Sequence, residues 1–67
     1  MIVIEAIFEA SAERRNDFVN LALQTMAASR LEKGCLLYHF TADLEHPNRF
    51  TLFELWDADA DLKAHFG

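Results

Sequence analysis

The stretch that decides the fold is Gly34–His65, which reads GCLLYHFTADLEHPNRFTLFELWDADADLKAH. It contains two runs of alternating side chains, residues 35–42 and 49–56, and both are rich in the aromatic residues that favour strands. The six residues between them include Pro47, which cannot donate a hydrogen bond to a β-ladder, and Asp and Asn side chains, which favour local bonds to the backbone. The pattern predicts a β-hairpin with a longer loop.

The alternation assigns an aromatic face to each strand of this hairpin. In the first strand the face holds Leu36, Tyr38 and Phe40, opposite to Leu37, His39 and Thr41; in the second it holds Phe50, Leu52, Glu54 and Trp56. Glu54 is therefore a carboxylate in apolar company. A buried carboxylate needs a partner, and we expect either Arg49 or a backbone donor.

The first half of the chain predicts a strand and a long helix. Residues 1–9 are rich in Ile, Val and Phe, and both faces of this strand are partly apolar, which suits a strand covered on both sides. Ser11 is an N-cap candidate, and Lys33 followed by Gly34 is a typical helix end. We expect a helix from about Ala12 to Lys33, with a helically spaced stripe of Phe18, Val19, Ala22, Met26 and Ser29, widened by Leu21 and Leu23.

A last helix is expected over residues 58–66, capped by Asp57. Leu62, His65 and Phe66 lie on one side of it. The order strand, helix, strand, strand, helix is one strand short of the ferredoxin-like βαββαβ unit. We therefore predict an α+β fold, with an antiparallel sheet and helices on one face.

Composition indicates one small domain, residues 1–67. The net charge of −5 argues against a nucleic-acid partner. No apolar run approaches the roughly 20 residues of a transmembrane helix, and the N-terminus lacks a signal-peptide layout. With a single cysteine, this favours a cytoplasmic protein without a membrane partner. A chain of this size leaves six Phe, one Trp and one Tyr hard to cover, so we expect a homodimer or higher oligomer.

Metal and nucleotide motifs are missing from the sequence. Its three histidines show no i, i+4 pair, there is no CxxC, and two glycines cannot make a phosphate-binding loop. We expect no metal site and no cofactor.

The chain resembles the antibiotic biosynthesis monooxygenase family along its whole length. The resemblance is carried by Gly34-Cys35-Leu36, Tyr38, Asp43, Pro47-Asn48-Arg49-Phe50, Glu54, Trp56, Leu62, Ala64 and His65. It implies a ferredoxin-like fold in a dimeric α/β barrel, with a second subunit against the free sheet face. Family members usually continue into a further helical segment and a last strand. We therefore expect a domain truncated at its C-terminus, either a fragment or a naturally short member.

Two departures narrow the branch of the family. Haem-degrading members carry an asparagine late in the first strand, where this chain has Ala6, and polyketide oxygenases carry one where this chain has Leu52. The resemblance then implies a quinol-monooxygenase-like branch. Such a protein oxidises a quinol or phenol-like aromatic molecule with O₂ and no cofactor. Two alternatives remain: a non-catalytic ligand-binding or assembly module of the same fold, and an isomerase of a small metabolite.

The site residues follow from the same resemblance. Trp56, Tyr38 and Phe50 would form the substrate-binding walls, although core packing is the commoner role of a residue such as Trp56 or Tyr38. The catalytic base would be His65, because imidazole titrates near neutral pH, or Glu54. Asp61, four residues before His65, could orient it.

The remaining polar candidates have structural interpretations. Cys35 has no adjacent base or cationic cluster and is expected to be a small buried hydrophobe rather than a nucleophile. His39 lies on the strand face opposite to Tyr38, and His46 lies in the hairpin loop. Both are expected to be structural or solvent-exposed.

Overall fold

The computed structural model describes all residues from 1 to 67 and contains three strands and two α-helices. In chain order these are β1 (Ile2–Glu9), the 3-10 turn η1 (Ala12–Arg14), α1 (Arg15–Ser29), β2 (Cys35–Ala42), β3 (Arg49–Trp56) and α2 (Asp59–Phe66). The strands form one antiparallel sheet in the order β1-β3-β2. This arrangement confirms the predicted ferredoxin-like α+β fold.

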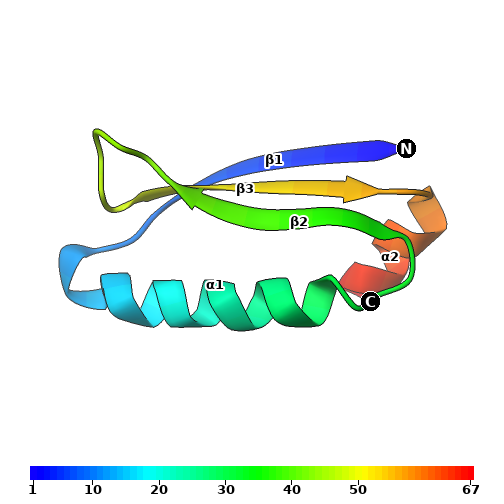
Figure 1. Cartoon of the computed structure of the whole chain (residues 1–67), viewed down its shortest axis with the longest axis horizontal. Coiled ribbons are helices and arrows are strands. Elements are labelled where there is room, and N and C mark those ends of the chain that lie inside the picture. The colour runs from blue at the N-terminus through cyan, green and yellow to red at the C-terminus, as the bar shows by residue number, and fades with distance from the viewer.

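The helices lie on one side of the sheet (Figure 1). Helix α1 runs along one face, and α2 packs at the end of the sheet where β3 ends. Its Leu62 contacts the same core cluster as Met26 of α1. The opposite face of the sheet has no helix over it.

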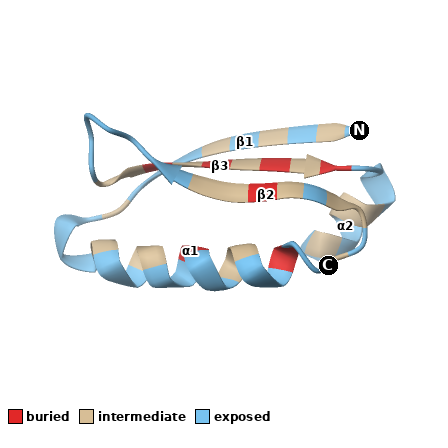
Figure 2. Ribbon diagram, viewed as in Figure 1, coloured by how far each residue is buried: buried red, intermediate tan, exposed pale blue.

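Strand β3 is the centre of the fold because it pairs on both sides. Its residues alternate strictly between half-buried and buried, and the buried set is Phe50, Leu52, Glu54 and Trp56. Figure 2 shows this concentration of buried residues along β3. The aromatic face predicted for β3 is therefore the face that packs on the helices.

The core has two parts along the sheet. At the α2 end, Tyr38, Leu52 and Trp56 form the buried cluster. Toward the hairpin loop, four phenylalanines pack with ring centroids 4.6–6.0 Å apart: Phe8, Phe18, Phe40 and Phe50. Such aromatic pairs stabilise beyond their buried area by roughly 0.5–1.5 kcal/mol each.

Helix α1 is shorter than the predicted span of Ala12 to Lys33. It begins at Arg15 after η1, and the Ser11 side chain makes no capping hydrogen bond. It ends at Ser29, because the amides of Leu31 and Glu32 bond to carbonyls three residues earlier and tighten the chain into turns. Gly34, at φ +81°, then turns the chain into β2. Similarly, α2 begins at Asp59 with Ala58 at the N-cap, without the cap expected from Asp57.

The prediction that Leu36 shares a face with Tyr38 is wrong. The β2–β3 register is interrupted between Cys35 and Leu37, so Leu36 forms a bulge and is 50% exposed. Cys35 takes the place opposite Trp56 instead. The stripe of α1 is also narrower than predicted, because Leu21 and Leu23 are mostly exposed.

The sheet face without helices carries several apolar side chains. Val3 and Ile7 of β1 are 58% and 66% exposed, and Phe53 and Leu55 of β3 are half-buried beside them.

Neither helix has the length and apolar character needed to pass through a lipid bilayer.

Candidate functional site

Trp56 and Glu54 form a buried polar pair at the α2 end of β3. The indole Nε1 of Trp56 donates a 2.9 Å hydrogen bond to Oε1 of Glu54. Trp56 is fully buried and Glu54 is 4% exposed. The expected partner Arg49 is at the other end of the strand and pairs with Glu9 across a 3.0 Å contact. An indole N–H, rather than a cation, is therefore the partner of Oε1 of Glu54.

His65 lies against the aromatic rings of this pair. Its ring centroid is 4.8 Å from that of Trp56 and 5.7 Å from that of Tyr38. Its Nδ1 is 2.7 Å from Oε2 of Glu32, in the turn between α1 and β2. Because an ionised carboxylate can only accept, the contact places a proton on Nδ1. The expected contact with Asp61 is absent: that carboxylate faces Lys33 at 4.0 Å.

The second ring nitrogen of His65 is open to solvent. Nε2 has no protein partner, and no buried side-chain nitrogen or oxygen in the structure lacks one. The His65 side chain as a whole is 15% exposed to solvent. One nitrogen is thus held by Glu32 while the other is free to accept or donate a proton.

Tyr38 supplies a phenol behind the histidine. It is 5% exposed and lies opposite Glu54 in the β2–β3 register. Burial raises the pKa of Tyr38, and the nearby Glu54 carboxylate raises it further, while a hydrogen bond from Ser29 acts in the opposite direction. The phenol therefore stays protonated at neutral pH and can only serve as a hydrogen-bonding group.

Cys35 is close to the same cluster but is poorly suited to nucleophilic chemistry. Burial raises the pKa of its thiol, and the Glu32 and Glu54 carboxylates add to that effect. A thiol kept protonated is a weak nucleophile. This supports the interpretation of Cys35 as a small packing residue.

Phe50 is not part of this cluster. It is six residues from Trp56 on β3, about 20 Å along an extended strand. Its ring packs on Phe18 with centroids 4.6 Å apart, and the Arg15 guanidinium lies 5.3 Å from its centroid. The structure thus brings together Trp56, Glu54, Tyr38 and His65 and leaves Phe50 at the opposite end of the sheet.

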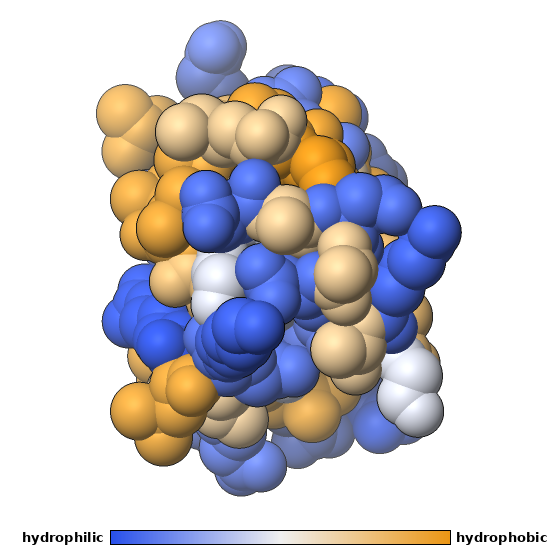
Figure 3. Space-filling view, turned by 90° about the vertical axis from the view of Figure 1, so that its right-hand side faces the viewer, coloured by the Kyte–Doolittle hydropathy of each residue, from blue (hydrophilic) through white to orange (hydrophobic).

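The hollows of the structure lie away from Trp56, Glu54 and His65, none of which lines one. A mainly apolar hollow of about 230 Å³ runs between α1 and the sheet, and Phe50 is one of its lining residues. Figure 3 looks onto the end of the molecule that carries α2, where hydrophilic side chains cover much of the centre. Of the cluster, Tyr38 lines a hollow of about 210 Å³ along β2, and the His65 ring keeps a solvent-exposed edge.

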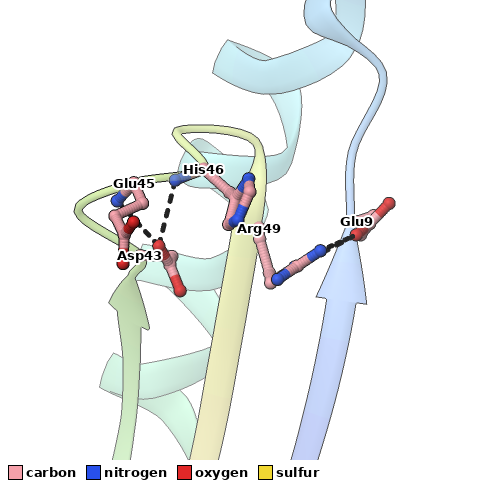
Figure 4. A network of polar contacts seen from close by, with 5 residues as sticks. All are labelled: Glu9, Asp43, Glu45, His46 and Arg49. Carbon is pink, nitrogen blue, oxygen red and sulfur yellow. Dashed lines mark hydrogen bonds and ion pairs between the residues drawn. The ribbon is translucent and has the colours of Figure 1, made fainter.

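The hairpin loop holds a second polar group (Figure 4). Oδ1 of Asp43 accepts hydrogen bonds from the amides of Glu45 and His46, at 2.8 and 3.0 Å. These bonds hold the pKa of Asp43 below its usual value. Glu9, Arg49 and His46 also line a polar hollow of about 370 Å³ beside the loop. No group of three His, Cys, Asp or Glu side chains in the structure could hold a metal ion.

Comparison of the sequence with known proteins gives a consistent result. The family model for antibiotic biosynthesis monooxygenase matches residues 1–67. The "Uncharacterized protein sll1783" of Synechocystis sp. is 32% identical over 65 residues, which cover 97% of this chain and 44% of that protein. The "Putative monooxygenase YcnE" of Bacillus subtilis is 31% identical over 65 residues, covering 97% of this chain and 68% of that protein.

Solved structures share the fold along almost the whole chain. The crystal structure of a "putative antibiotic biosynthesis monooxygenase" from Deinococcus radiodurans superposes with a TM-score of 0.97 at 33% identity, covering 100% of this chain and 66% of that one. A conserved protein from Methanosarcina mazei superposes with a TM-score of 0.90 at 26% identity, covering 96% and 63%. The chain thus spans less than half of the cyanobacterial relative and roughly two thirds of the others. The family model covers all residues from 1 to 67, and so includes every element that builds the Trp56–His65 cluster. This chain therefore belongs to the antibiotic biosynthesis monooxygenase family.

Proposed function

We propose that this domain belongs to a cofactor-independent monooxygenase that oxidises a quinol or phenol-like small aromatic molecule with O₂. The observation that carries the proposal is the state of His65: Nδ1 is held by a carboxylate and Nε2 is open to solvent, against an aromatic wall. Family membership supports the oxygenase chemistry. The names of the Bacillus and Deinococcus relatives point the same way.

The proposed chemistry begins with proton transfer to His65. A phenolic O–H that donates to Nε2 would lose its proton to the imidazole, which is a general base suited to neutral pH. The electron-rich anion can then pass one electron to O₂. Recombination of the two radicals places a peroxide on the ring, and the imidazolium of His65 returns its proton to that peroxide. Cleavage of the O–O bond with loss of the hydrogen on the same ring carbon releases water and leaves one oxygen atom on the substrate.

Trp56 and Tyr38 pack against the His65 ring and would hold it in place during this step. Trp56 and Tyr38 are too deeply buried in this chain to form an open wall on their own. We propose that they hold the imidazole plane and that the substrate approaches the exposed edge of His65. The buried pair of Trp56 and Glu54 makes the second base candidate, Glu54, less accessible than His65.

The experiment is aerobic turnover of a small quinol panel by metal-free and flavin-free protein. Oxygen uptake and ¹⁸O incorporation from ¹⁸O₂ measure the reaction. His65→Ala should lower the rate by roughly 10²–10⁴-fold, the usual contribution of a general base. The matched control is His46→Ala, at an exposed loop position, which should leave the rate unchanged. Full activity in folded His65→Ala would contradict the proposed role.

A non-catalytic binding module is the second candidate. It is favoured by one observation: none of the hollows is lined by Trp56, Glu54 or His65. Such a protein would bind quinols without consuming O₂. Calorimetric titration of the same panel under nitrogen and under air separates the two functions. A third candidate, an isomerase that uses the free Nε2, would convert its substrate at the same rate without O₂.

A further inference from the structure

We infer that Glu32 is the positioning residue of His65, an inference that rests on the proposed function of this histidine as a base. Oε2 of Glu32 and Nδ1 of His65 are 2.7 Å apart, although the two residues are separated by 33 positions in the chain. The contact joins the turn after α1 to the last helix. Glu32 does not reach Nε2 and is not itself proposed to touch the substrate.

The backbone holds Glu32 in place on both sides. Its amide donates to the carbonyl of Ser29 at 3.0 Å, and its carbonyl accepts from the amide of Cys35 at 3.2 Å. Ser29 is buried at the end of α1, and Cys35 begins β2. The carboxylate is thus presented from a turn fixed between two elements, which limits the conformations that the contact must immobilise.

The contact determines which nitrogen can act as a base. In a neutral imidazole one nitrogen carries the proton and the other accepts. A carboxylate at Nδ1 keeps the proton there and leaves the Nε2 lone pair facing solvent. When Nε2 takes a second proton, the same carboxylate stabilises the imidazolium that results.

Glu32 is the only charged side chain that forms a hydrogen bond or ion pair with His65. From β2 and β3 the ring meets Tyr38 and Trp56, and within α2 it meets Phe66. Glu54 lies behind the indole and is engaged with it. The charged residues of α2 itself are paired elsewhere: Asp59 with Lys63, and Asp61 with Lys33. Loss of Glu32 would therefore leave no substitute carboxylate at Nδ1.

The test combines ¹⁵N NMR of the labelled imidazoles with quinol turnover, in wild type, Glu32→Ala and Glu32→Gln. Neutral wild-type His65 should be protonated at Nδ1. Glu32→Ala should shift it to the Nε2–H form and lower turnover by about 10-fold or more, since a misplaced proton disables the base. Glu32→Gln keeps an acceptor oxygen within reach of Nδ1, so it should retain much of the Nδ1–H form and much of the turnover.

Asp61→Asn, which alters the other carboxylate four residues before His65, is the matched control and should change neither readout. If Glu32→Ala fails to fold, Glu32→Asp, which shortens the side chain by one methylene, should show the same tautomer shift. An Nε2–H form already present in the wild type, or unchanged turnover in Glu32→Ala, would overturn the inference. Absence of turnover in every protein would reject the proposed function, while the tautomer shift would still test the placement of His65 by Glu32.

Discussion

Trp56 donates its indole N–H to the carboxylate of Glu54, which lies two residues earlier on the same face of β3, over a distance of 2.9 Å. Both side chains are buried, and Glu54 forms no ion pair. An acceptor in this position loses its water on folding and depends on the donor that replaces it. The Trp residue thus supports the sheet by a hydrogen bond as well as by its packed area.

Replacing Trp56 with Phe should destabilise the fold more than the lost ring area implies. The change removes the donor to a buried carboxylate, and an unsatisfied buried charged group costs about 1–3 kcal/mol or more. We expect the free energy of unfolding, measured with urea, to fall by about 2–4 kcal/mol. In a Glu54→Leu background the same change should cost at least about 1 kcal/mol less. Additive losses in this double-mutant cycle would contradict the dependence of Glu54 on Trp56.

The fold was largely predictable because its decisive signals are local. The strict alternation of 49–56 sets one face of β3 inward, and Pro47 places the hairpin loop. What the pattern missed are competing local bonds. The turns after Ser29 shorten α1 through i to i−3 hydrogen bonds, and a bulge at Leu36 shifts one side chain outward. The turns and the bulge do not change the spacing of the apolar residues, so that spacing could not predict them.

The candidate site was predictable only in part. His65, Glu54, Tyr38 and Trp56 share one face and one end of the sheet, which their positions in the pattern imply. Glu32 was missed because it was assigned to the helix and lies 33 residues from His65. Phe50 was grouped with Trp56 because both face the helices, although six residues of an extended strand already separate them by about 20 Å.

Alkaline pH should destabilise the fold through Cys35. Burial raises the pKa of this thiol above 9.0, so near that pH the unfolded chain loses its proton before the folded chain does. The folded state then binds more protons, and stability falls as pH rises. The contribution is complete below pH 9.0 and is lost progressively as pH rises through the folded pKa.

Thermal unfolding between pH 7 and about 10 measures this effect. Cys35→Ala should flatten the decline that begins near pH 9.0, whereas Tyr38→Phe should leave the decline between pH 9.0 and 10.0 largely in place, because the phenol titrates from 10.0 upward. Any quinol turnover should stay within a few-fold in Cys35→Ala. An unchanged decline in that variant would show that the thiol is not the responsible group.

Gly34→Ala should destabilise the chain on two grounds. Gly34 adopts φ +81°, a conformation that costs a side-chain-bearing residue about 1–2 kcal/mol. A Cβ there would also overlap the Asp61 side chain of α2. We expect the free energy of unfolding to fall by roughly 2–3 kcal/mol. Replacing Gly34 with D-alanine in a synthetic chain should avoid both penalties, because a D-residue accepts φ +81° and carries its Cβ on the other side of the Cα. Equal losses for L- and D-alanine would contradict this explanation.

The helix-free face of the sheet is expected to bind a second copy of the chain. Val3 and Ile7 are more than half exposed on this face, with Phe53 and Leu55 beside them, and a stable interface would bury about 800 Å² on each partner. Phe53→Lys should dissociate the oligomer, and lysine is chosen because Glu5 lies opposite and would repel a carboxylate.

Leu44→Lys is the matched control for this change, since Leu44 is fully exposed in the hairpin loop, outside the face. Sedimentation velocity should show a dimer or larger species for the wild type and Leu44→Lys, and a folded monomer for Phe53→Lys. The reason is that a lysine in the middle of this face must lose its water when the interface forms, and pairing with Glu5 does not offset that cost. A folded wild-type monomer at micromolar concentration would exclude the dimer, and equal dissociation by Leu44→Lys would place the interface elsewhere.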